Sequence, residues 1–136
     1  MNRFPSAAHL CSWAGLAPGN HESAGKRKSG KTTKGNQKLR SYLVEAARAT
    51  SRSKNTYLSS MYHRIAARRG ANRTAVALAH PILAIVYHLL KEKKEYHELG
   101  PNYYEERRHT QVSKQAIRKL ESLGYKVTIE AMNQLA

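Results

Sequence analysis

The sequence lacks aspartate altogether. All nine acidic residues are glutamates, against 24 lysines and arginines, and the formal net charge is +15. A charge so far from zero indicates a polyanionic partner. The charge spreads over loops and several expected helices rather than one amphipathic stretch, which favours nucleic acid over a membrane surface. A basic surface without any partner is the alternative that composition leaves open.

Cysteine and long hydrophobic runs are also scarce. Cys11 stands alone, which excludes an internal disulfide, and its small apolar neighbours predict a buried thiol. The apolar run 75–90 is interrupted by two histidines and a proline, so we expect no membrane span and no membrane partner. Because no signal peptide pattern opens the chain, we expect a cytoplasmic protein. The chain starts almost inside a structured element, so we also expect it to be the later part of a longer protein.

Helical periodicity dominates the apolar pattern and predicts a small, mainly α fold. The predicted helices cover residues 7–14, 36–52, 55–69 and 72–95. The last of them is expected to hold most of the core and to kink at Pro81. Its expected core residues are Val76, Leu78, Ile82, Leu83, Ile85, Val86, Leu89 and Leu90.

Two domains are expected along the chain. Residues 1–99 would form the helical domain, and residues 100–136 would form a helical tail that ends in a short strand. That strand is predicted from the alternation of Tyr125, Val127 and Ile129. A lone strand is not stable by itself, so it would need a partner.

The first helix and the segment after it predict a phosphate-binding element. Ser6 is the expected cap of the first helix, and the residues from Gly15 to Gly19 stop it in a helix-hairpin-helix-like turn. Residues 20–35 have no period and predict a basic loop. Two glycines and seven cations are expected to bind nucleic acid: Gly15, Gly19, Lys26, Arg27, Lys28, Lys31, Lys34, Lys38 and Arg40.

Two other patterns in the sequence suggest a P-loop and a metal site, and both have simpler interpretations. The segment from Gly25 to Thr32 fits the pattern of a phosphate-binding P-loop, but no buried strand precedes it and no aspartate exists to help hold magnesium. The seven histidines and Cys11 lack the spacing of metal ligands, so we expect no metal site in the chain.

Ser23 is the hydroxyl of interest in the basic loop. Ala24 and Gly25 follow it, and such small residues let a phosphate approach. An unactivated serine is a poor nucleophile, and His21 and Glu22 are the only local candidates for a base. Most loop serines have no chemical role, so the residues alone do not decide between catalysis and none.

A series of short motifs runs along most of the chain. They are Phe4-Pro5-Ser6-Ala7, Leu10 through Gly19, Ser23-Ala24-Gly25-Lys26, Lys34-Gly35-Asn36 with Leu39-Arg40, Ala46-Ala47-Arg48-Ala49, Tyr62 with Arg64, Ala75 to Ala79, Tyr96-His97-Glu98-Leu99-Gly100 and Leu120-Glu121-Ser122-Leu123-Gly124-Tyr125. Together they resemble the C-terminal transposase domain of the DEDD-type insertion-sequence transposases, the 110/116/902 group.

The resemblance implies a DNA recombinase that works with a second domain. A RuvC-like domain would supply acidic residues and Mg²⁺, and Ser23 would attack the scissile phosphate and form a phosphoserine link to DNA. Lys26, Lys34 and Arg40 would be phosphate ligands. A structured guide RNA and a homo-oligomer belong to the same expectation.

This chain departs from the family pattern because the acidic domain is missing. We therefore expect a truncated copy that binds nucleic acid but does not recombine DNA alone. Two alternatives are a non-catalytic helix-hairpin-helix-type binding module and an inactive remnant.

Overall fold

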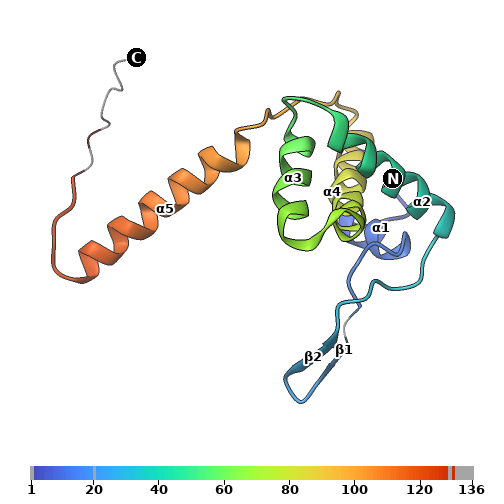
Figure 1. Ribbon diagram of the computed structural model, residues 1–136, viewed down its shortest axis with the longest axis horizontal. Helices are drawn as coiled ribbons and strands as arrows, with labels where there is room; N and C mark the ends of the chain where they lie inside the picture. The colour runs from blue at the N-terminus through green and yellow to red at the C-terminus, as the bar shows by residue number, and fades with distance from the viewer. Residues whose placement is uncertain (1, 20, 129, 131–136) are drawn as a thin grey trace. The chain divides into compact units, whose positions relative to one another are not determined.

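The structure is a computed structural model that describes residues 2–19, 21–128 and 130, with Arg27 described for its backbone alone. The chain divides into two units, Met1–Pro101 and Asn102–Ala136. Helices dominate both, which confirms the predicted mainly α class (Figure 1). In chain order the elements are α1 (Ala7–Trp13), β1 (His21–Ser23), β2 (Lys26–Ser29), α2 (Gln37–Ala49), a 3₁₀ turn η1 (Thr50–Arg52), α3 (Tyr57–Arg69), α4 (Ala71–Glu92) and α5 (Tyr103–Ser122).

Side-chain caps set the starts of the first three helices. The hydroxyl of Ser6 accepts a hydrogen bond from the backbone N–H of His9, as the sequence predicts. Asn36 caps α2 and Thr56 caps α3 in the same way. Such caps satisfy backbone donors that have no partner inside the helix. At the other end of α3, Gly70 takes a positive φ of 76° and separates α3 from α4.

The core of the first unit forms around α4, which packs against α1, α2 and α3. Its first cluster joins α4 to α1 and α2 and contains the buried residues Leu10, Cys11, Ala14, Leu16, Leu43, Ala79, Leu83 and Tyr87. The second joins α4 to α2 and α3 through Ala47, Tyr62, Ala75 and Leu78. Alanines at the contacts let the helix backbones approach closely, so few large side chains are needed.

Two buried polar groups in the first cluster are satisfied by backbone carbonyls. The hydroxyl of Tyr87 donates to the carbonyl of Phe4 over 2.9 Å. The thiol of Cys11 lies 3.6 Å from the carbonyl oxygen of His80, and burial raises the pKa of that thiol. The prediction of a buried thiol is confirmed. These bonds tie the N-terminal segment to α4.

The structure corrects two core predictions for α4. Val86 and Leu90 are 37% and 60% exposed, so neither belongs to the core. The helix continues through Pro81 as a single element, and the kink expected there stays a prediction. Among the described helices, α4 alone is long and apolar enough to cross a membrane by length and composition. Its packing against three helices gives that apolar composition a role in the core.

The second unit consists of α5 and the residues after it. No residue of α5 is buried, and its apolar residues Val112 and Leu120 are exposed. Gly124 follows the helix with a positive φ of 88°. Residues 125–128 form no strand, so the predicted strand is wrong there, and Ile129 lies outside the described residues. A strand needs a neighbour to pair with, and these residues have none in the part of the tail that is described.

Candidate nucleic-acid interface

Residues 21–29 form a two-stranded hairpin, where the sequence predicted a loop. β1 and β2 pair antiparallel, with Ser23 opposite Lys26. Ala24 and Gly25 connect them, and both have positive φ values, 51° and 72°. Positive φ at both central residues is the requirement of a type I′ turn, which matches the twist of paired strands. Alanine is rare at such a position, so the usual residues that signal a hairpin are absent here. We call residues 21–29 the hairpin arm.

The hairpin arm extends away from helices α1–α4 of the first unit (Figure 1). Its base is held by backbone hydrogen bonds outside the strands. The amide of Gly19 donates to the carbonyl of Lys31 over 2.8 Å, and that of Thr33 donates to the carbonyl of Ala17 over 3.2 Å. The arm is therefore anchored at its base, while every described side chain at its tip is exposed.

Gly15 and Gly19 are buried in the backbone packing at the base of the arm. A Cβ on Gly15 would lie 2.9 Å from the amide nitrogen of Gly35, and one on Gly19 would lie 2.8 Å from the carbonyl oxygen of Lys31. The amide of Gly15 donates to the carbonyl of Ser12, and that of Gly19 to Lys31. The sequence predicted that these glycines bind nucleic acid, but both amides are already bonded within the chain. Their evident role is close packing.

Ser23 is the last residue of β1 and is exposed. Residues directly opposite each other in an antiparallel pair carry their side chains on the same face, so the hydroxyl of Ser23 and the ammonium of Lys26 share one face of the arm. Successive side chains of a strand alternate, which puts Glu22 on the other face. His21 lies two residues earlier, beyond an irregularity in the register. Within the described residues, no hydrogen bond to the Ser23 hydroxyl is formed.

The predicted cations lie along the arm, its base and the start of α2. Lys26 and Lys28 belong to β2, whereas Lys38 and Arg40 belong to α2. All the predicted lysines are exposed, and Arg40 is half-buried. The ion pairs found in the described part of the chain join Glu45 or Glu92 to other residues, so none of them neutralises these cations. The arm and its base thus form a predominantly positive surface, in which Glu22 is the one carboxylate among the described residues.

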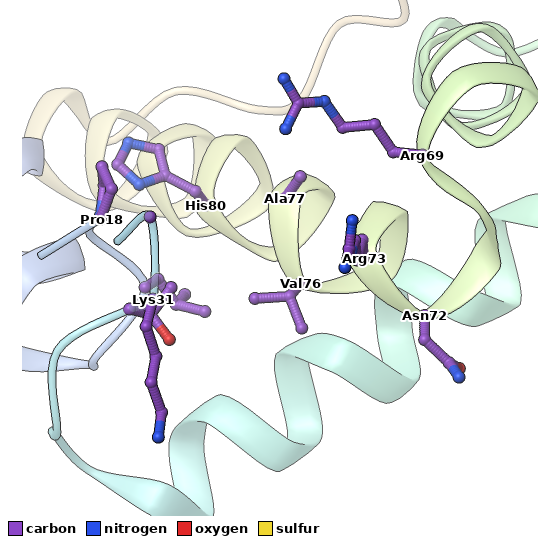
Figure 2. A pocket seen from close by; sticks show the side chains of 11 residues that line it. Pro18, Lys31, Arg69, Asn72, Arg73, Val76, Ala77 and His80 are labelled. Carbon is purple, nitrogen blue, oxygen red and sulfur yellow. The ribbon is translucent and has the colours of Figure 1, made fainter. Parts of the chain in front are cut away.

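A cleft that the sequence did not reveal lies between the base of the arm and α4. It is open to solvent and has a volume of about 820 Å³, and we call it the α4 cleft (Figure 2). Its lining residues are Leu16, Pro18, Gly30, Lys31, Thr32, Arg69, Asn72, Arg73, Val76, Ala77 and His80. They include three cations and no carboxylate. Arg69 and Arg73 were not predicted to bind nucleic acid. They are distant in sequence from the arm, and the corner between α3 and α4 places them near its base.

Metal ligands do not gather anywhere in the described part of the chain. Residues 2–19, 21–128 and 130 contain no group of three or more histidine, cysteine or glutamate side chains that could hold an ion. The described residues therefore do not fit the Mg²⁺ that the resemblance implies.

The first unit is a small helical domain with a positively charged two-stranded arm. Comparison with known proteins relates it to a family: residues 1–64 match the family model described as "Transposase IS116/IS110/IS902 family". The chain is also similar to the transposase for insertion sequence element IS1111A of Coxiella burnetii (strain RSA 493 / Nine Mile phase I), with 33% identity over 100 residues. No solved structure matches the chain.

The match to the Coxiella transposase covers 71% of this chain but only 28% of that relative. The chain thus spans a small part of the relative's length. Both comparisons therefore report a similarity of this chain to insertion-sequence transposases.

Proposed function

We propose that this chain is the DNA-binding part of an insertion-sequence transposase and that its hairpin arm presents Ser23 to a DNA backbone. The observation that carries the proposal is the position of Ser23, exposed at the tip of a cationic arm and on the same face as Lys26. The match of residues 1–64 to the transposase family supports it.

In this proposal the arm supplies a nucleophile and a positive charge. The Oγ of Ser23 forms a bond to phosphorus as one bridging P–O bond breaks. The serine proton passes to a base, and the departing DNA end takes up a proton from water and leaves as a free hydroxyl. Lys26 binds a non-bridging oxygen and stabilises the charge that develops there. Glu22 is poorly placed as the base because it lies on the opposite face of β1.

Other components of the reaction would come from outside this chain. The resemblance implies Mg²⁺ in a RuvC-like domain. The described residues of this chain offer no group of ligands for a metal ion, so this chain is not proposed to hold it. A structured guide RNA, assembly as a homo-oligomer and a cytoplasmic location belong to the same proposal. By itself, the chain is expected to bind DNA without cutting it.

The catalytic part is tested by placing residues 1–136 in the matching region of the full-length IS1111A transposase and measuring covalent adducts with labelled DNA. Ser23→Ala should abolish the adduct, because alanine has no hydroxyl to attack phosphorus. Ser29→Ala, which removes another hydroxyl of the same arm, is the matched control and should retain it. An undiminished adduct with Ser23→Ala would show that this serine is not the nucleophile.

The binding part is tested on the chain itself by fluorescence anisotropy with duplex DNA at several salt concentrations. Removing two phosphate contacts with Lys26→Ala/Lys28→Ala should weaken binding about tenfold and reduce the salt slope by about two. The control removes two exposed lysines of α5, Lys114→Ala/Lys119→Ala. Equal losses in the two double variants would mean that charge alone, and not the arm, accounts for binding.

A non-catalytic nucleic-acid-binding module is the second candidate. It is favoured by one observation: no base contacts the Ser23 hydroxyl within the described residues. If Ser23→Ala formed the full amount of adduct and the lysine variants bound DNA more weakly, the chain would be a non-catalytic binding module. A helix-hairpin-helix mode of binding would have to use amides other than those of Gly15 and Gly19, which are already bonded. A chain that fails to bind DNA at low salt would instead be an inactive remnant.

A further inference from the structure

We propose that the α4 cleft binds a single-stranded segment of the nucleic acid whose backbone the hairpin arm contacts. This inference rests on the proposed DNA binding and adds a second binding site, distinct from the tip of the arm. It assigns a role to Arg69 and Arg73, which line the cleft together with Lys31.

The charge of the cleft suits an anion. Lys31 comes from the base of the arm, Arg69 from the end of α3 and Arg73 from the first turn of α4. No carboxylate lines the cleft, and none of the ion pairs in the described chain involves these three side chains. A cleft lined by cations and by no carboxylate attracts a phosphate group. The planar fork of arginine matches phosphate oxygens well.

The floor of the cleft suits a sugar or the face of a base. Leu16, Val76 and Ala77 are apolar lining residues, and Figure 2 shows Val76 pointing from α4 toward the segment that carries Lys31. In the same view, Pro18 and His80 lie toward one end of the cleft and Asn72 toward the other. An apolar floor under a cationic rim is the arrangement that tracks a backbone with little sequence preference.

The size of the cleft selects a single strand over a duplex. At about 820 Å³ it falls within the usual range for pockets that enclose small ligands, roughly 300–1,000 Å³. One or two nucleotide units fit such a space, and a double helix does not. A strand that leaves the duplex near the arm can therefore enter it.

The cleft is also close enough to the tip for one strand to reach both. Lys31 lies five residues after Lys26, a span of about 17 Å in extended chain. A strand that keeps the duplex rise of about 3.4 Å per nucleotide covers this span with roughly five nucleotides, and a more extended strand needs fewer. A five-nucleotide overhang is therefore the probe of choice.

The test compares two DNA probes, a blunt duplex and the same duplex with a five-nucleotide overhang, by fluorescence anisotropy on the full chain. Arg69→Ala/Arg73→Ala should weaken overhang binding about tenfold and blunt-duplex binding less than twofold. The control, Arg52→Ala/Arg68→Ala, removes two exposed arginines that do not line the cleft and should change both by less than twofold. Equal losses in the two double variants would overturn the proposal.

A second pair of variants changes the space in the cleft without changing charge. Ala77 is exposed and lines the cleft, so Ala77→Leu should reduce overhang binding about fivefold without lowering the thermal midpoint. Ala67→Leu adds the same side chain to an exposed site on α3 outside the cleft and should leave binding unchanged. Unchanged binding with Ala77→Leu would overturn the proposal.

Adding ATP to the wild-type chain tests whether the cleft binds the phosphate of a free nucleotide rather than that of a DNA strand. Binding of ATP that Arg69→Ala/Arg73→Ala abolishes, with no change in overhang binding, would make the cleft a nucleotide site and overturn the single-strand proposal. A wild-type chain that binds both DNA probes equally would refute the cleft assignment while leaving the proposed function intact. A wild-type chain that binds neither would refute the proposed function, and the cleft assignment with it.

Discussion

The helical body and the hairpin arm of the first unit are stabilised in different ways. In the body, α4 buries apolar side chains against three other helices, and residues such as Leu78 are fully buried. In the arm, the described side chains of β1 are all exposed, and the turn at Ala24 and Gly25 defines the geometry. The body therefore draws its stability from packing, whereas the arm depends on turn geometry and on hydrogen bonds at its base.

This difference shows how such a protein can separate stability from binding. Substitutions in the body should change the free energy of unfolding, and those at the tip of the arm should change binding with little effect on folding. The base of the arm belongs to both regions, because Gly15 and Gly35 pack there against each other's backbone. Four substitutions, taken in order of expected effect, test this separation.

The largest effect is expected at Leu78. It is 0% exposed in the second core cluster, and Leu78→Ala removes its contacts and leaves a cavity. Such substitutions cost about 2–5 kcal/mol. Urea unfolding followed by circular dichroism measures the loss. On the same helix, Leu90 is 60% exposed, and Leu90→Ala is expected to cost less than about 0.5 kcal/mol. Similar losses at both positions would contradict the core that the structure describes.

The next effect is expected at the junction of body and arm. A Cβ on Gly35 would lie 2.6 Å from the carbonyl oxygen of Trp13, which is backbone and cannot rotate away. Gly35→Ala should therefore destabilise the chain by about 2 kcal/mol, the range of overpacking. Gly25 is the matched control because nothing lies within 4 Å of its Cβ position, although its positive φ is unfavourable for alanine. Gly25→Ala should leave the midpoint of global unfolding nearly unchanged. If both variants lowered the midpoint equally, the arm and the body would unfold as one cooperative unit.

A smaller, pH-dependent effect is expected at Glu98. Its carboxylate accepts hydrogen bonds from the backbone N–H of Tyr57 over 2.7 Å, from that of Gly100 and from the Tyr96 hydroxyl. Burial acts to raise the pKa of Glu98, but these hydrogen bonds outweigh it and lower the pKa from its usual 4.5. The same site raises the pKa of Tyr96 to about 12, through burial and then the bond to Glu98.

Because the pKa of Glu98 is lower in the folded chain, its contribution is complete above the unfolded value and is lost as pH falls below it. Glu98→Gln should cost about 0.5–1 kcal/mol at neutral pH, the modest value of an exposed capping group. It should also flatten the decline in stability below about pH 4.5. Thermal midpoints measured from pH 3 to pH 7 test both points, and an unchanged slope would contradict the assignment.

The smallest effect on global stability is expected at the turn of the arm. Ala24 has a φ of 51°, and asparagine tolerates this conformation better than alanine. Ala24→Asn should increase amide protection in β1 and β2 by about 0.5 kcal/mol or less, and Ala24→Val should reduce it. Hydrogen exchange followed by NMR gives this measurement. A change in protection throughout α4 would contradict the independence of the arm.

Much of the body could be predicted from the sequence because its signals are local. Ser6 and Gly70 mark helix ends by caps and backbone conformation, and helical spacing identifies Leu78 and Leu83 as core residues. Val86 and Leu90 were misassigned because spacing does not show how much of a helix is covered.

The site was harder to predict because its geometry depends on contacts distant in sequence. The turn at Ala24 lacks the usual hairpin residues, so its strands went unrecognised. The α4 cleft joins Lys31 to Arg69 and Arg73, about 40 residues away, and no local pattern shows that proximity. The role of Ser23 stays a prediction, for which the structure supplies a position.

The burial of Cys11 also has a practical consequence. Its thiol is fully enclosed by the core and is held in the protonated form by its raised pKa, so it should react slowly with maleimides. The natural chain can therefore serve directly as a background for site-directed labelling. A cysteine introduced at an exposed position of the arm would take up a fluorophore selectively, and energy transfer to a fluorophore on a DNA ligand could then report when the two meet.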